Sequence, residues 1–444
     1  MTTDRPPSSP TRTIGASLGL LVLVGCGQEK ETPDAAKGPA ASLTGKVMCG
    51  YQGWFRAPGD GTEIGWRHYT NPSTGKFEPG HAGIEVWPDM SELGENERFD
   101  TPFRHADGST AQVFSSAVRE TVVRHFQWME DYGIDGVFVQ RFGTEVTRGS
   151  RRADHPMSRS LDTVLDNCRA GAGAHGRTYA VMYDLSGMKP EALAGLREDW
   201  RHLVAGKGIL KDAAYQHHAG RPVVAIWGVG FKDREYGPDE VGELIRFLKE
   251  DPECGGLTVM LGTSTGWRNG ERDASPFAEW ERVYALAGII SPWMVGRFRD
   301  REGARKYARG RAAGDLQWCE DRGKDFMPVV FPGFSWSNLK KGTDHNPDAY
   351  IDRDGGRFLW TQYDALIRET GVSMIYQAMF DELDEATQIF KTSNNPPVGE
   401  SRFLDNDGLP SDHYLWLVGE ATRRLRGEAA STPELPDRHA TPRD

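Results

Sequence analysis

The sequence predicts a (β/α)8 barrel with a long first loop, and three observations support this fold class. Eight short, almost continuously apolar runs recur along the chain, as is typical of parallel strands covered on both faces. Stretches with a helical spacing of apolar residues separate these runs. No glycine-rich dinucleotide-binding motif follows the first run, which disfavours the alternative, a doubly wound open sheet.

The eight predicted strands alternate with amphipathic helices. The helices are indicated by apolar residues three or four positions apart, as in the stripe Val118, Val122, Phe126 and Met129. Since eight strand–helix repeats fill one barrel, we expect a single barrel domain over residues 45–427 and a disordered tail at 428–444. The predicted strands lie at residues 47–51, 136–140, 179–183, 223–227, 257–261, 288–291, 327–331 and 373–380.

Composition excludes several classes of protein. Among 444 residues there are 53 Lys and Arg against 64 Asp and Glu, and the resulting net charge of −11 disfavours nucleic acid as a partner. Hydrophobic residues make up 38% of the chain, enough for a large core. No apolar run approaches the roughly 20 residues of a membrane-spanning helix, which excludes a multi-span membrane protein.

The N-terminus has the pattern of a targeting signal. Arg5 and Arg12 precede an apolar stretch over residues 14–25, which is followed directly by Cys26. This order resembles a bacterial lipoprotein signal, with cleavage before Cys26 and acylation of its thiol; the alternative is an ordinary secretory signal with a chance cysteine. We therefore expect a signal peptide over 1–25, a flexible tether over 26–44, and a protein lipid-anchored in the bacterial cell envelope, on the periplasmic face or the cell surface.

The remaining cysteines carry no recognisable motif. None is spaced as in a CxxC pair, so we expect buried free thiols, with one disulfide left open in an exported protein. They are Cys49, Cys168, Cys254 and Cys319.

The connection after the first predicted strand is unusually long. Residues 55–117 separate that strand from the next helix and contain Trp66 and Trp87. Long loops at the strand C-termini build the active sites of barrels, so we expect this segment to form one wall of a substrate groove. The alternative is a decorative insertion.

Polar and aromatic residues follow the predicted strands, at the end of a barrel where ligands bind. No histidine cluster or G-x-S-x-G motif occurs among them, so neither a metal, a cofactor nor a serine nucleophile is expected. Aromatic rings beside carboxylates suit carbohydrate chemistry, although Trp227 and Trp293 could equally pack, and Arg141 and Asp184 could form a structural ion pair. The candidate ligand contacts are Tyr51, Trp54, Arg141, Asp184, Trp227, Trp293, Trp336, Asn338 and Asp381.

The densest signal is a run of acids after the eighth predicted strand. Asp381, Glu382, Asp384 and Glu385 fall within five positions, and their mutual repulsion raises the pKa of at least one carboxyl group. One carboxyl can then act as a general acid while its neighbour is ionised. The alternatives are a solvated charge run, disfavoured by the apolar strand that leads into it, and a calcium loop, disfavoured by the absence of glycine and regular spacing.

Residues 380–389, Phe-Asp-Glu-Leu-Asp-Glu-Ala-Thr-Gln-Ile, resemble the Phe-Asn-Glu-Trp-His-Glu-Gly-Thr-Gln-Ile signature of glycoside hydrolase family 99. That family contains endo-acting α-mannosidases and α-mannanases built on (β/α)8 barrels. Residues 50–55, 331–334 and 353–356 are also similar to family segments. The chain further resembles family 71/99-like bacterial proteins that are often labelled xylosidase/arabinosidase.

The resemblance implies roles for two glutamates. Glu382 would accept the proton of the sugar 2-hydroxyl, whose oxygen attacks C1, and Glu385 would protonate the leaving oxygen and later activate water. This route retains configuration through a 1,2-anhydro sugar and needs a 1,2-trans glycoside, which α-mannose, α-arabinofuranose and β-xylose all provide. Leu383 and Asp384 replace the family's Trp and His, so the resemblance implies the reaction class more strongly than the sugar.

Two other classes of function compete with a hydrolase of oligosaccharides or polysaccharides. A non-catalytic carbohydrate-binding lipoprotein could use the same barrel, because fold does not fix function. A purely structural envelope protein would not need aromatic residues at the strand ends. The presence of both Glu382 and Glu385 favours the enzyme.

Overall fold

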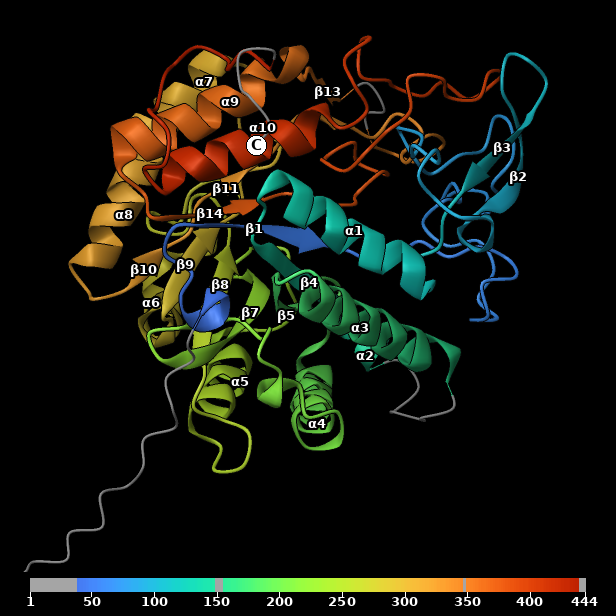
Figure 1. Cartoon of the computed structure of the whole chain (residues 1–444). Coiled ribbons are helices and arrows are strands. Elements are labelled where there is room, and N and C mark those ends of the chain that lie inside the picture. The colour runs from blue at the N-terminus through green and yellow to red at the C-terminus, as the bar shows by residue number, and fades with distance from the viewer. Residues whose placement is uncertain (1–37, 148–154, 346–348, 439–444) are drawn as a thin grey trace, which may run out of the picture. The chain divides into compact units, whose positions relative to one another are not determined.

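The predicted barrel is confirmed by the computed structural model, which describes residues 38–147, 155–345 and 349–438. A parallel sheet runs in the order β10-β9-β8-β7-β5-β4-β1-β14-β11, so its two ends are β10 and β11, neighbours in the chain (Figure 1). Its strands are β1 (Lys46–Tyr51), β4 (Gly136–Phe142), β5 (Thr178–Asp184), β7 (Arg221–Val229), β8 (Thr258–Thr263), β9 (Ile289–Pro292), β10 (Asp325–Phe326), β11 (Val329–Val330) and β14 (Met374–Gln377). A short β6 (His217–His218) pairs antiparallel with β7.

The seventh barrel strand is divided, where the sequence predicts one run over 327–331. β10 pairs with β9, and β11 pairs with β14. The strand is divided at Pro328 because proline has no N–H with which to continue a ladder. Backbone hydrogen bonds bridge the break: Met327 N donates to Ile290 O at 2.9 Å, and Tyr376 N donates to Pro328 O at 2.9 Å. Residues 325–330 therefore act as one strand and close the barrel.

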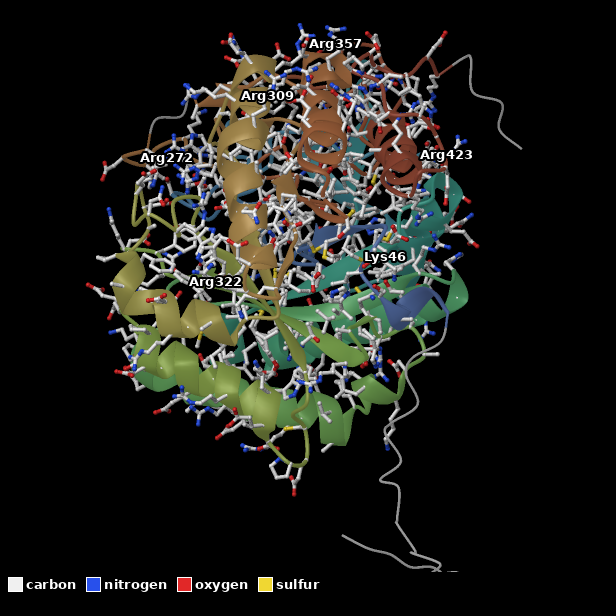
Figure 2. All side chains as sticks on the ribbon, turned by 90° about the vertical axis from the view of Figure 1, so that its left-hand side faces the viewer. Lys46, Arg272, Arg309, Arg322, Arg357 and Arg423 are labelled. Carbon is white, nitrogen blue, oxygen red and sulfur yellow. The ribbon has the colours of Figure 1, made fainter. Side chains whose placement is uncertain are left out.

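Helices cover the outside of the sheet, as the view onto the face where the strands begin shows (Figure 2). The predicted stripe on α1 is confirmed, since Val122, Phe126 and Met129 are buried against the core, and α1 ends at Gly133 in the left-handed conformation that glycine adopts readily. The helices are α1 (Arg119–Tyr132), α2 (Gly143–Val146), α3 (Pro156–Ala174), α4 (Ala194–Arg201), α5 (Pro238–Glu250), α6 (Phe277–Leu286), α7 (Arg301–Tyr307), α8 (Ala313–Glu320), α9 (Arg357–Asp364) and α10 (His413–Leu425).

The predicted signal peptide, the lipid attachment site at Cys26 and most of the tether lie outside the described residues. The end of the predicted tether is already part of the fold: Ala40 and Leu43 are buried, and Leu43 N donates to His218 Nδ1 at 3.2 Å. Within the described residues, no helix combines the length and the apolar character needed to cross a bilayer.

The C-terminal segment differs from its prediction. Residues 428–438, expected to be disordered, lie against α9 and α10. Trp360 Nε1 donates to Thr432 O at 3.1 Å, and Arg438 pairs with Asp412 at 2.6 Å. The barrel domain therefore continues beyond residue 427.

The four cysteines expected to be thiols are confirmed as free and buried: Cys49, Cys168, Cys254 and Cys319.

The long loop over residues 55–117 has its own core at the end of the barrel toward which the strands point (Figure 1). It contains the antiparallel pair β2 (Phe99–Arg104) and β3 (Thr110–Val113), and backbone bridges from Val86 to Leu404 and from Pro88 to Thr392 fasten it to the segment before α10. Trp87 is buried among aromatic rings of this core, so it supports the loop from inside.

Candidate active site

The acidic run lies where β14 turns back across the barrel mouth. Phe380 N donates to Gly50 O at 2.8 Å, which ties the turn to β1, and the buried Leu383 accepts a hydrogen bond at its carbonyl from Glu85 N at 2.9 Å. The four acids are thereby fixed between the barrel and the long loop. Each has a different environment.

Asp381 is a structural acid. Its two carboxylate oxygens accept hydrogen bonds from Gln52 N at 2.7 Å and Gly53 N at 2.8 Å, the backbone that follows β1. Burial raises the pKa of Asp381 to about 7 even though these donors favour the charged form. Predicted as a ligand contact, Asp381 instead lies in the interior and joins the ends of β1 and β14.

Glu382 is held by two neutral donors. Gln52 Nε2 donates to Oε1 at 2.7 Å, and the Thr387 hydroxyl donates to Oε2. Burial and the neighbouring Asp384 raise the pKa of Glu382 to about 8, against the effect of both donors. Sequence reasoning did not single out Gln52 and Thr387, although each lies in a segment that resembles the family pattern.

Asp384 pairs with a histidine from the long loop. His68 Nδ1 lies 3.0 Å from Asp384 Oδ2, and Oδ1 is buried with no hydrogen-bond partner among the described residues. Burial raises the pKa of Asp384 to about 8. Burial also lowers the pKa of His68 well below its ordinary value, as do the charges of Arg67 and Arg56.

Glu385 is the half-buried member of the four and faces a cavity. Burial raises its pKa well above the ordinary value, and repulsion from Glu382 and Asp384 adds to the effect. The cavity has a volume of about 410 Å³. The long loop supplies most of its lining; the lining residues are Trp54, Ile64, Trp66, Arg67, His68, Thr70, Pro72, Leu339, Asp384 and Glu385.

Three predicted tryptophans lie at other parts of the mouth. Trp227 on β7 and Trp293 after β9 meet edge to face, with ring centroids 5.5 Å apart. Trp336 is half-buried, and Lys340 Nζ lies 5.4 Å from its ring centroid. A fourth, Trp54, reaches the cavity, but His68 and Phe142 stack on its ring, so it is not an open platform for a sugar.

Tyr51, Asn338 and Asp184 are bonded to protein groups in the interior. The Tyr51 hydroxyl lies 2.9 Å from His125 Nδ1, and Asn338 N donates to Glu85 Oε1 at 2.6 Å. Asp184 accepts a hydrogen bond from the backbone N–H two positions on at 2.7 Å, and burial raises its pKa to about 6. These three residues therefore have structural roles beneath the mouth of the barrel. Their positions at strand ends do not by themselves distinguish such a role from contact with a ligand.

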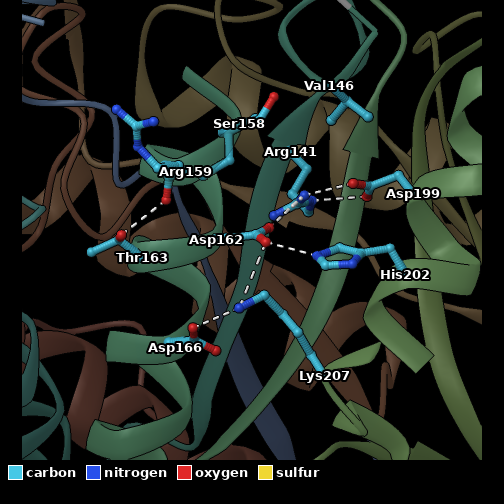
Figure 3. Close-up of a pocket in the computed structure, with 11 residues that line it drawn as sticks. Arg141, Val146, Ser158, Arg159, Asp162, Thr163, Asp166, Asp199, His202 and Lys207 are labelled. Carbon is cyan, nitrogen blue, oxygen red and sulfur yellow. Dashed lines mark hydrogen bonds and ion pairs between the residues drawn. The ribbon is translucent and has the colours of Figure 1, made fainter. Parts of the chain in front are cut away.

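Arg141 lies in a second cavity, of about 400 Å³, outside the sheet beside α3 and α4 (Figure 3). Its Nε and Nη2 bond both oxygens of Asp199 at 3.0 and 2.7 Å, and Nη2 also lies 3.1 Å from Asp162 Oδ1. Arg141 thus forms a structural ion pair, the alternative considered above, but its partners are Asp199 and Asp162 and not Asp184.

Fold and site together define a closed (β/α)8 barrel with a run of acidic side chains at its mouth whose pKa values are raised by burial. No protein-family model matches the chain, and no curated protein matches it. Among solved structures, its fold is similar to that of the GH99 endo-alpha-mannosidase from Bacteroides thetaiotaomicron in complex with BIS-TRIS-Propane, at a TM-score of 0.60 and 17% identity over 87% of this chain and 99% of that one.

A further structure of the endo-alpha-mannosidase matches at a TM-score of 0.60 and 16% identity, with the same coverage of 87% and 99%. A glycoside hydrolase-like protein matches at a TM-score of 0.52 and 12% identity over 80% of this chain and 99% of that one. At these identities the likeness establishes a GH99-like fold, which confirms the fold that residues 380–389 imply.

Proposed function

We propose that this protein is a retaining glycoside hydrolase that cleaves a 1,2-trans glycosidic bond with Glu382 and Glu385. The observation that carries the proposal is the difference between these two carboxyl groups. Like charges raise the pKa of both, but Glu382 is enclosed and accepts hydrogen bonds from Gln52 and Thr387 that favour its charged form, whereas Glu385 faces the cavity. Such a division between two carboxyl groups suits acid and base roles in one site.

In the first step, ionised Glu382 accepts the proton of the sugar 2-hydroxyl, and that oxygen attacks C1. Glu385 donates its proton to the departing glycosidic oxygen. In the second step, ionised Glu385 takes a proton from water, the water oxygen attacks C1, and Glu382 returns its proton to O2. Two inversions at C1 retain the configuration, and Gln52 and Thr387 orient the Glu382 carboxylate throughout.

An α-mannan-like substrate is favoured by the resemblance of residues 380–389 and by the similar fold of an endo-alpha-mannosidase. A β-xyloside or α-arabinofuranoside also has the required 1,2-trans geometry. Asp384, where the family signature has histidine, changes the surroundings of Glu385 and leaves both catalytic glutamates in place.

The test is hydrolysis of α-mannan, arabinan and xylan by the purified protein, with the first-formed anomer of the product read by proton NMR. We expect hydrolysis of at least one of them with retained configuration. An inverted product would contradict the mechanism, because inversion means that water attacks C1 directly. Direct attack needs more widely spaced carboxyl groups. Binding without hydrolysis would instead identify a carbohydrate-binding protein.

We further propose that the enzyme is held at the cell envelope by a lipid on Cys26, on the basis of the sequence pattern alone. Replacement of Cys26 by alanine should release the protein from the membrane fraction. Equal partitioning of the variant and the unmodified chain would contradict the anchor.

A further inference from the structure

His68 is held in a conformation that residues other than glycine adopt infrequently. Its φ is +60°, in the left-handed region, where histidine is one of the more tolerated side chains. The backbone on either side is fixed: Arg67 exchanges hydrogen bonds with Arg56 at 3.2 and 3.3 Å, and the carbonyl of the buried Tyr69 accepts from Gly83 N at 2.7 Å. A residue in this sparsely populated region persists where the surrounding contacts fix it, as they do here.

The imidazole ring is fixed as firmly as the backbone. It stacks on Trp54 with a centroid separation of 3.8 Å and an interplanar angle of 5°, and its Nδ1 lies 3.0 Å from Asp384 Oδ2. The His68 side chain is 25% exposed and lines the cavity, whereas that of Asp384 is only 4% exposed. No described residue forms a hydrogen bond with His68 Nε2, so this atom is the free polar end of the pair.

The pairing of His68 with Asp384 determines whether Nε2 of His68 carries a hydrogen atom. Burial raises the pKa of Asp384 and lowers that of His68, so near neutral pH the two groups have no net charge. A neutral pair places its shared proton either on Oδ2 or on Nδ1, and in both arrangements Nε2 keeps its own hydrogen. His68 therefore presents a hydrogen-bond donor to the cavity.

The cavity lies on one side of the two glutamates. Glu385 lines it, and the enclosed Glu382 does not. In the proposed reaction Glu385 meets the leaving oxygen and Glu382 meets the 2-hydroxyl, so space next to Glu385 alone belongs to the leaving group. Apolar walls of Trp66 and Leu339 beside a polar donor suit a sugar ring, which has apolar faces and a rim of hydroxyl groups.

We infer that this cavity is the leaving-group subsite of the enzyme and that His68, held by Asp384, donates an Nε2–H hydrogen bond to a hydroxyl oxygen of the departing sugar. The inference rests on the proposed hydrolase function. It assigns His68 to substrate binding, because the proton that reaches the leaving oxygen comes from Glu385.

The test compares two substrates in a His68→Asn variant. Asparagine tolerates the left-handed backbone, and its amide can replace Nδ1–H toward Asp384, but it has nothing at the position of Nε2. On the polysaccharide that the wild type hydrolyses fastest, kcat/KM should fall about 10-fold, the effect of one lost hydrogen bond. On the fluoride of the same sugar, which has no leaving sugar, it should change less than about twofold by the same reasoning.

His175→Asn is the matched control, because His175 pairs with Glu130 at 2.8 Å away from the cavity; it should leave both substrates unaffected. Equal losses on the two substrates in His68→Asn, or no loss on either, would overturn the role of His68. The proposed function would stand in that case, because the wild type still hydrolyses the substrates. A wild type that hydrolyses neither substrate would overturn the proposed function itself, and the subsite with it.

A spectroscopic measurement decides the matter if His68→Asn fails to fold. Nitrogen-15 NMR of the wild type at pH 7 should show His68 with hydrogen on Nε2, and this signal should move when the reducing-end product of the same polysaccharide is added. An Nε2 without hydrogen, or a signal that saturating product leaves unmoved, would overturn the inference.

Discussion

Two clusters of buried and half-buried acids, one beside β4 and one after β14, are stabilised by different kinds of partner. Beside β4, Arg141 bonds both oxygens of Asp199 and one of Asp162 (Figure 3). After β14, the side chains of Asp381, Glu382 and Asp384 are bonded to backbone N–H groups, an amide, a hydroxyl and an imidazole. Opposite charges neutralise the first cluster, and retained protons neutralise much of the second.

The pKa of Asp162 in the first cluster and the pKa values of the acids after β14 move in opposite directions. Burial would raise the pKa of Asp162, but the charge of Arg141 lowers it below the ordinary value. Burial raises the pKa of Asp381, Glu382 and Asp384 to about 7, 8 and 8, because it outweighs the hydrogen bonds that they accept and, for Asp384, the charge of Lys340. An ion-paired cluster holds structure together, whereas a cluster that exchanges protons near neutral pH can carry out acid–base catalysis.

The largest effect should come from removing a proton-transfer group. Glu382→Gln should lower hydrolysis by about 10²–10⁴-fold, the usual contribution of general acid–base catalysis. It should leave stability near pH 7 unchanged or higher, because glutamine replaces a carboxyl group that burial already disfavours as a charge. Initial rates and urea unfolding measure the two effects. Glu243→Gln, on the exposed face of α5, should alter neither, and a Glu382→Gln protein with near wild-type rates would refute the role.

The opposite pattern is expected in the ion-paired cluster. Asp199→Asn leaves Arg141 buried without its bidentate partner, so the free energy of unfolding should fall by about 3–5 kcal/mol while the folded variant keeps its activity. Urea unfolding measures the loss. Asp239→Asn, which breaks an exposed pair with Arg282, should cost less than about 1 kcal/mol. A small loss for both variants would remove the distinction between the clusters.

Stability should also respond to pH through the acidic run. The folded-state pKa values of Asp381, Glu382 and Asp384 lie above their unfolded values, so the folded state binds more protons between about pH 4.5 and 8 and loses stability as pH rises. Asp384→Asn should flatten this slope by up to about 1.4 kcal/mol per pH unit. Urea unfolding at pH 5, 6, 7 and 8 tests this, and identical slopes in the two proteins would contradict the retained protons.

A smaller effect should follow from weakening one donor to Glu382. Thr387→Val removes a hydroxyl that favours the charged carboxylate, so the pKa of Glu382 should rise further and the ascending limb of the pH–rate profile should move to higher pH. At pH 7 the rate should fall by about 2- to 10-fold, the effect of one hydrogen bond. Thr361→Val, whose hydroxyl bonds the helix backbone at Arg357, is the control. An unmoved limb would show that Thr387 does not tune the base.

The barrel was predictable from the sequence because buried parallel strands are apolar throughout, and that pattern is local. Periodicity finds the run over 327–331 but not the pairing around Pro328, which depends on strands far away in the chain. The acids were visible for the same local reason. His68 was not, because its partner Asp384 is 316 positions away and nothing in the loop sequence marks the contact.

Side-chain direction limited the prediction of the ligand contacts. Tyr51 and Trp54 both follow the first strand closely, yet Tyr51 points into the interior toward His125 and Trp54 reaches the cavity. β1 ends at Tyr51, so strand alternation does not set the direction of Trp54, which depends on the packing of the turn that follows. Only the packed structure resolves that choice.

The most direct test of the central claim compares leaving groups in two variants. If Glu385 supplies a proton to the leaving oxygen, Glu385→Gln should lose far less activity on an aryl glycoside with a strongly acidic leaving group than on the natural glycan. If Glu382 takes its proton from the sugar 2-hydroxyl, Glu382→Gln should be impaired equally on both substrates. If Glu385→Gln also lost activity equally on both substrates, the division of roles between the two glutamates would be contradicted. Near wild-type rates in either folded variant would contradict it as well.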